Sequence, residues 1–179
     1  MSPKSTVYHF SIELSDIDRG VYESFKLPTA LHPSESLEFM LGRVVAFALE
    51  YETGIAFSAG LGATEDPAIS IRGYDGTYKA WIDVGAPSAE RLHRAAKLAP
   101  RVAVYCHRSA DVVYQRLTQA PIFRGDSVAF YSFQDDFISE LVATLDRRNE
   151  VAISRSDSTL YVQSNGRSHS SAVIERYLT

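Results

Sequence analysis

The chain has 179 residues, of which 45% are hydrophobic and 22% charged, a composition typical of one compact soluble domain with a single core. Its one cysteine excludes an internal disulfide and a CxxC metal site and favours a reducing, cytoplasmic setting. The formal net charge of −4 argues against tight nonspecific nucleic-acid binding, and no apolar run has the length of a signal peptide or a membrane span.

The N-terminal half predicts a hairpin, a helix and three strands. Residues 7–14 and 21–27 alternate between apolar and polar side chains, with turn residues between them. The strongest helical pattern follows over 35–51, with Ser34 as its expected N-cap and acids in its first turn. Short strand patterns come next, over 55–60, 68–73 and 78–84.

The C-terminal half alternates helices and strands. Helices are predicted over 89–98, from Ser109 to 119, and over 135–147, and strands over 102–106, over 128–133 and from 150 onward. Asn165-Gly166 predicts a hairpin turn. The Ser-rich stretch 153–171 is interpreted as turns and solvent-facing positions. The order predicts one α/β or α+β domain over residues 1–179, with a central mixed sheet flanked by helices.

Three acids occupy positions where a carboxylate is unusual. Glu38 borders the apolar stripe of the first helix, Asp66 precedes a strand, and Asp83 ends the strand YKAWIDV, on the face that carries Lys79 and Trp81. If the fold brings them together, they could bind Mg²⁺ and activate water against a phosphodiester. Each also has a structural interpretation. Glu38 could be exposed or pair with Arg43, and the two aspartates could form turns or caps.

The segments HPSESLEFMLGR (32–43), EDP (65–67) and WIDVGAPSAERLHRA (81–95) together resemble the YaeQ family of bacterial proteins. This resemblance implies a core similar to PD-(D/E)XK, restriction-endonuclease-like nucleases, with extra strands at both termini. On that pattern Asp66 is similar to the first motif acid and Asp83 to the acid of (D/E)XK. Glu38 is similar to the supporting helix glutamate, and the three acids would bind Mg²⁺ or Mn²⁺.

The chain departs from this pattern at the motif lysine, whose position holds Gly85, and at Asp83, where the family usually has glutamate. A lysine there would orient the attacking water and stabilise developing negative charge. Lys79 lies about 13 Å from Asp83 along the strand. The replacement cations considered are Arg43, Arg94 and Lys97, each of which could instead be a solvated surface residue.

Two functions are weighed at this point, and a third, an enzyme that acts on a small substrate, has no pocket signature in the sequence. One is a metal-dependent nucleic-acid phosphodiesterase that lacks the motif lysine. The other is an inactive nuclease-like fold that binds a partner, which could be a protein or a nucleic acid at a local basic patch. Whether the chain is an enzyme is left undecided. A membrane partner is not expected. The sequence carries no GxGxxG or GxxxxGK[ST] loop, so no nucleotide cofactor is indicated, and the oligomeric state is not predicted.

Overall fold

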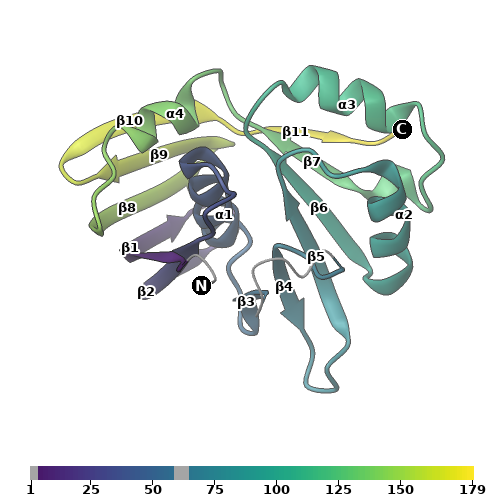
Figure 1. Cartoon of the computed structure of the whole chain (residues 1–179), viewed down its shortest axis with the longest axis horizontal. Coiled ribbons are helices and arrows are strands. Elements are labelled where there is room, and N and C mark those ends of the chain that lie inside the picture. Colours follow the sequence, from purple (N-terminus) through teal and green to yellow (C-terminus); the bar gives the residue numbers. More distant parts are fainter. Residues whose placement is uncertain (1–3, 59–64) are drawn as a thin grey trace. The chain divides into compact units, whose positions relative to one another are not determined.

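A computed structural model describes residues 4–58 and 65–179. These residues form two mixed β-sheets and four α-helices, and they divide into two compact units (Figure 1). Unit 1 comprises residues 1–49 and 133–173, and unit 2 comprises residues 50–132 and 174–179. The mixed α+β class is therefore confirmed, whereas the sequence predicted one central sheet. Whether the two units fold together as one domain stays a prediction.

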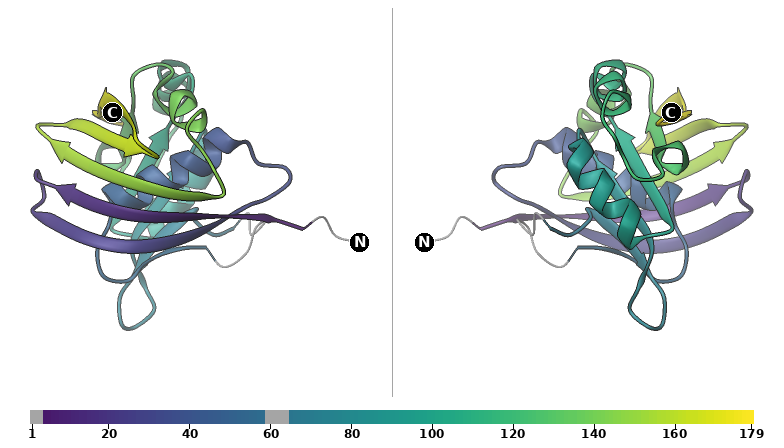
Figure 2. Two further views of the ribbon diagram at one scale, coloured as in Figure 1. Left: turned by 90° about the vertical axis from the view of Figure 1, so that its left-hand side faces the viewer. Right: turned by 90° about the vertical axis from the view of Figure 1, so that its right-hand side faces the viewer.

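Unit 1 contains a five-stranded sheet with the order β10-β9-β8-β1-β2. Its elements are β1 (Thr6–Asp16), β2 (Val21–Leu31), α1 (Leu37–Leu49), α4 (Phe137–Val142), β8 (Arg148–Ser156), β9 (Thr159–Ser164) and β10 (Arg167–Ala172). The left view of Figure 2 shows its long strands running side by side across the picture. The N-terminal hairpin extends over more residues than predicted, and β1 pairs in parallel with β8, about 140 residues later in the chain, as in His9 opposite Arg148. Local sequence patterns do not indicate a pairing between segments so far apart in the chain.

Helices α1 and α4 cover one face of this sheet. Leu41 of α1 and Leu141 of α4 line the same interior space as Phe10, Ile153 and Val162 of the strands, so the apolar half of each strand faces the helices. The other half, offset by one residue, faces away from them. Unit 1 therefore has one face that its own helices cover and one face that neither α1 nor α4 covers.

Two helices of unit 1 differ from their predicted form. Helix α1 begins at Leu37, and Ser36 rather than Ser34 accepts a hydrogen bond from the Phe39 amide. Helix α4 ends at Val142 although the pattern predicted a helix to residue 147. The Asn149 side chain accepts from the Asp146 amide and donates to its carbonyl, which holds the chain in a turn directly before β8.

Unit 2 contains a six-stranded sheet with the order β11-β7-β6-β5-β4-β3. Its elements are β3 (Ile55–Phe57), β4 (Ile69–Arg72), β5 (Tyr78–Val84), α2 (Ala89–Leu98), β6 (Arg101–Cys106), α3 (Ala110–Thr118), the 3-10 turn η1 (Gly125–Ser127), β7 (Ala129–Ser132) and β11 (Ile174–Tyr177). The predicted strand over 55–60 ends at Phe57, and residues 59 and 60 lie outside the described part of the chain. Strands β5, β6 and β7 are parallel.

Helices α2 and α3 pack on one face of these parallel strands. Leu92 of α2 and Leu117 of α3 are fully buried in one cluster with Trp81, Val104 and Phe130. Helix α2 has the predicted bounds, because Ser88 accepts from the Arg91 amide at 3.1 Å as its N-cap. Ser109 precedes α3 as predicted, but with φ 52° and without a capping hydrogen bond from its side chain. No helix among the described residues is long and apolar enough to cross a membrane.

Candidate functional site

Asp83 lies near the end of β5 on the same face as Trp81, as the strand alternation predicted. Its side chain is buried, and its Oδ2 accepts a hydrogen bond from Trp81 Nε1 at 3.0 Å. Oδ1 accepts from the backbone amide of Ala68 at 3.4 Å. The carboxylate is therefore fixed between β5 and the residues that lead into β4.

Arg91, in the first turn of α2, neutralises this carboxylate. Its Nε lies 2.7 Å from Asp83 Oδ2 and its Nη2 lies 2.9 Å from Asp83 Oδ1, which is the two-point geometry of a strong arginine–carboxylate pair. The hydrogen bonds to Asp83 raise the pKa of the Arg91 guanidinium, although burial lowers it. The guanidinium also lies 5.4 Å from the Trp81 ring centre.

The backbone of Asp66 also contacts the Arg91 guanidinium. Its carbonyl oxygen accepts from Arg91 Nη2, and its exposed side chain lines a cavity of about 210 Å³. Ser70, Arg72 and Tyr78 line this cavity as well. Arg91 thus contacts the carboxylate of Asp83 and the backbone carbonyl of Asp66, and a shared site for the two aspartate side chains stays a prediction.

Gly85, at the position where the resemblance implies a lysine, has a backbone conformation that favours glycine. It follows the last residue of β5 with φ 89°, and its amide donates to the Tyr105 carbonyl at 2.9 Å. This left-handed conformation strains any residue with a Cβ. A lysine at position 85 would carry that cost, so the backbone at the end of β5 itself favours glycine.

Two other predicted site residues belong to unit 1. Glu38 and Arg43 belong to α1 in unit 1, so the contribution of Glu38 to a site with Asp66 and Asp83 stays a prediction. Arg43 pairs with Glu35 at 2.8 Å and donates to the Ala30 carbonyl. Its guanidinium therefore holds α1 against β2.

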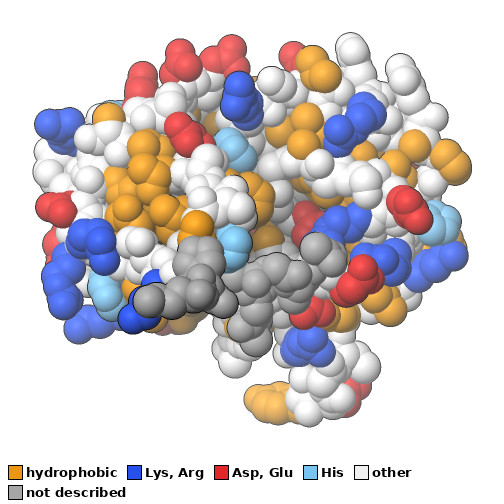
Figure 3. Space-filling model, in the orientation of Figure 1, with side chains coloured by type: hydrophobic (Ala, Val, Ile, Leu, Met, Phe, Trp, Pro, Cys, Tyr) orange, Lys and Arg blue, Asp and Glu red, His pale blue; other side chains and the backbone are white. Residues whose placement is uncertain are grey.

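The predicted cations of α2 are exposed. Arg94 pairs with Glu65 at 2.9 Å, and Lys97 lies in the last turn of the helix. Lys79 pairs with Glu52 at 3.3 Å, away from Asp83. On the visible face, blue and red side chains alternate over the part of the view that contains α2 and α3 (Figure 3). This face of unit 2 shows no large basic patch. Phosphate binding by Arg43, Arg94 or Lys97 stays a prediction.

The arrangement around Asp83 does not fit a divalent metal ion. A magnesium site needs carboxylate oxygens with free lone pairs, whereas both Asp83 oxygens already accept from Arg91. Within residues 4–58 and 65–179, no three His, Cys, Asp or Glu side chains are placed to hold a metal together. Binding of Mg²⁺ or Mn²⁺ would require Arg91 to leave, and it stays a prediction for direct measurement.

Sequence reasoning considered Arg94 and Lys97 as replacement cations but missed Arg91. The signal was the short turn GAPS (85–88), which reverses the chain so that α2 begins beside the end of β5. Helical side chains lean toward the helix N-terminus, so a first-turn arginine reaches back to Asp83. The backbones of Arg94 and Lys97 lie about 4.5 and 9 Å further along the helix axis than that of Arg91.

A protein-family model described as "YaeQ protein" matches residues 1–173. The chain belongs to the YaeQ family. It is 24% identical over 163 residues to the "Uncharacterized protein YaeQ" of Escherichia coli (strain K12) and to that of Salmonella typhi. Each match covers 90% of this chain and 90% of the relative.

Two solved YaeQ structures share the fold. The YaeQ protein from Pseudomonas syringae is 32% identical with a TM-score of 0.88, over 98% of this chain and 96% of that one. The YaeQ protein from Xanthomonas axonopodis pv. citri is 24% identical with a TM-score of 0.90, over 97% of this chain and 98% of that one. The predicted family is confirmed, and the relation to PD-(D/E)XK nucleases stays a prediction.

Proposed function

We propose that this YaeQ-family chain is a binding or regulatory protein that does not hydrolyse phosphodiesters, with unit 2 as a PD-(D/E)XK-like scaffold. The observation that supports this function is the two-point pairing of Arg91 with Asp83. An arginine fixed in this way supplies the positive charge that a metal would otherwise supply, without the water that a metal would activate.

Neither Arg91 nor Gly85 can act as a general base, which also supports a function without hydrolysis. Arg91 remains protonated at any physiological pH and cannot accept a proton from water. Gly85 supplies no side chain at all. In this function the ion pair fixes the turn between β5 and α2, and the exposed carboxylate of Asp66 at the cavity of about 210 Å³ is the group available to a partner.

The second function is a metal-dependent nucleic-acid phosphodiesterase. The exposed side chain of Asp66, whose backbone carbonyl accepts a hydrogen bond from Arg91, favours it. In that case Arg91 would release Asp83 and turn toward a phosphate, which guanidinium groups bind in two-point fashion. The two functions differ in whether Asp83 is free, so they predict opposite results with metal ions.

The test combines metal titration with a cleavage assay. Isothermal titration of the full chain with MgCl₂ or MnCl₂ at millimolar concentration is expected to give only heat of dilution. Labelled single- and double-stranded DNA and RNA incubated with the chain and Mn²⁺ are expected to stay intact. Both results follow from the engagement of the Asp83 oxygens by Arg91.

Cleavage that requires Mn²⁺ and is lost in Asp66→Asn would overturn the proposal in favour of the phosphodiesterase. The matched control is Asp126→Asn, which removes an exposed carboxylate of the same unit at η1. Cleavage that survives Asp66→Asn and Asp83→Ala would come from a contaminating nuclease and would leave the chain itself inactive, as proposed.

A further inference from the structure

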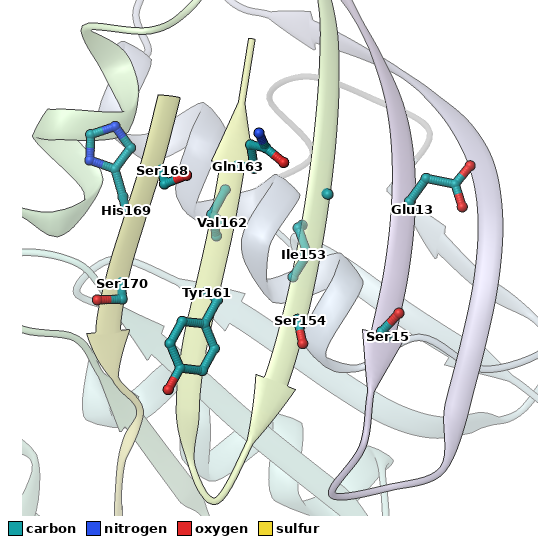
Figure 4. A pocket seen from close by; sticks show the side chains of 11 residues that line it. Glu13, Ser15, Ile153, Ser154, Tyr161, Val162, Gln163, Ser168, His169 and Ser170 are labelled. Carbon is teal, nitrogen blue, oxygen red and sulfur yellow. The ribbon is translucent and has the colours of Figure 1, made fainter. Parts of the chain in front are cut away.

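The face of the sheet in unit 1 that α1 and α4 do not cover carries a trough, and most of the residues that line it have polar groups. Strand register places Ser15, Ser154 and Tyr161 side by side in one row across β1, β8 and β9, and Glu13, Ala152 and Gln163 in the next row. Ser170 and Ser168 continue the two rows onto β10. These eight residues line a cavity of about 440 Å³ (Figure 4), a volume within the usual range of roughly 300–1,000 Å³ for small-molecule sites.

The floor of this trough is made of small side chains. Ser15, Ala152 and Ser154 leave space above the middle strands, whereas Tyr161 stands at one side and is 51% exposed. Tyr22 of β2, 61% exposed, continues the first row on the opposite side of Ser15, beyond the cavity lining. Three strand spacings separate the two tyrosines, so their backbones lie about 14 Å apart.

The polar groups of the trough have unused hydrogen-bonding capacity. Among the described residues, six lining side chains make no hydrogen bond to another protein group: Ser15, Ser154, Gln163, Ser168, Ser170 and Tyr161. Glu13 accepts from the Ser24 hydroxyl through Oε2. An amide and several hydroxyls therefore face the same open space, with the Glu13 carboxylate at its edge and directed toward β2 (Figure 4), and each can exchange its water for a ligand hydroxyl.

Charge restricts what can bind there. The lining contains no lysine or arginine, and Glu13 is the charged side chain at the edge of the trough. His169, which also lines the cavity, belongs to the opposite face, where its Nδ1 lies 3.5 Å from Glu140 of α4. Within this lining, a phosphate or a nucleic-acid strand would meet a carboxylate and no cation, so the lining residues favour an uncharged ligand rich in hydroxyl groups.

We propose that this face of unit 1 binds a neutral oligosaccharide. The C–H face of a sugar ring packs against the Tyr161 ring, which offers apolar area together with a phenolic hydroxyl. The sugar hydroxyls donate to Glu13 and exchange hydrogen bonds with Gln163 and the serines of the floor. This binding goes beyond the function proposed for unit 2 and does not depend on it.

The test uses maltotriose, cellotriose and N,N′,N″-triacetylchitotriose as neutral probes and a dT₁₀ oligonucleotide as an anionic one. Saturation-transfer NMR and isothermal titration of the full chain are expected to show at least one neutral trisaccharide binding with a Kd of about 1 mM or lower. Tyr161→Ala is expected to weaken that binding about five- to tenfold. Glu13→Gln is expected to weaken it as well. The dT₁₀ strand is not expected to compete for this face.

Tyr74→Ala is the matched control, because Tyr74 is a fully exposed tyrosine in the turn between β4 and β5 of the other unit. It is expected to leave the Kd unchanged. Circular dichroism verifies that each variant is folded. The proposal is overturned if no neutral trisaccharide binds, if Tyr161→Ala binds as tightly as the unmodified chain, or if dT₁₀ displaces the sugar.

Discussion

Replacement of Arg91 by alanine is expected to lower the free energy of unfolding by about 3 kcal/mol, because it leaves a buried carboxylate without its counter-charge. The side chain of Asp83 is 4% exposed, so water cannot replace the two lost hydrogen bonds. The hydrogen bond from Trp81 to Asp83 Oδ2 remains, so we expect the loss of unfolding free energy to lie at the lower end of the usual range. Urea unfolding followed by the fluorescence of Trp81, the single tryptophan, measures this change.

Arg94→Ala is the matched control on the same helix. Arg94 and Glu65 form an ion pair whose side chains are 44% and 76% exposed, and pairs of this kind contribute at most about 1 kcal/mol. The double variant Asp83→Leu/Arg91→Met removes both charges and is expected to be more stable than Arg91→Ala. An unfolding free energy for Arg91→Ala within about 0.5 kcal/mol of the unmodified chain would contradict a structural ion pair.

This stability measurement also bears on function. A carboxylate that depends on Arg91 for its burial cannot also be a readily available metal ligand, because metal binding would first have to break the pair. If Arg91→Ala lowers the free energy of unfolding only slightly, Asp83 does not depend on Arg91 for its stability. The metal-dependent phosphodiesterase then becomes the better interpretation. The unfolding experiment therefore separates the two functions without a substrate.

Much of the local structure could be predicted from the sequence, since it depends on neighbouring residues. Ser88 and the polar first turn determine where α2 begins, and Asn165-Gly166 forms the turn between β9 and β10 with φ angles of 50° and 83°. The shared face of Trp81 and Asp83 follows from strand alternation alone. These features require no knowledge of distant segments.

The parts that could not be predicted depend on pairing between distant segments. The parallel pairing of β1 with β8 creates a second sheet from the two ends of the sequence, and no local pattern distinguishes it from an extension of a central sheet. Arg91 was missed for a related reason. Its role depends on the direction in which α2 leaves the turn after β5, whereas its sequence position resembles that of any exposed helical arginine.

A second buried carboxylate organises the opposite face of the sheet in unit 2. Glu50 accepts from Arg101 Nη2 at 2.7 Å and from the Tyr105 hydroxyl at 2.7 Å. Tyr105 stacks on Tyr131 with ring centres 4.7 Å apart, and the Tyr131 hydroxyl donates to Glu175 of β11. This network joins β6, β7 and β11 through groups that must keep their protons.

Stability is expected to fall steeply above about pH 10, where tyrosines ionise in the unfolded chain. Burial first, and then the charge of Glu50, raise the pKa of Tyr105 well above its usual value. A group whose pKa is higher in the folded state contributes stability below its unfolded pKa and loses it as the pH rises toward the folded pKa. Tyr105 alone therefore contributes a decline of about 1.4 kcal/mol per pH unit in this range.

Tyr105→Phe removes this titration while keeping the ring that stacks on Tyr131. At neutral pH it is expected to cost about 2 kcal/mol, since a hydrogen bond to a charged group is lost, but its unfolding free energy then declines less steeply between about pH 10 and 11. Urea unfolding across this range measures both quantities. Tyr74→Phe removes a fully exposed hydroxyl and is expected to leave the slope unchanged. Equal slopes for Tyr105→Phe and the unmodified chain would show that the Tyr105 hydroxyl ionises in the folded state as readily as in water, which its burial against Glu50 opposes.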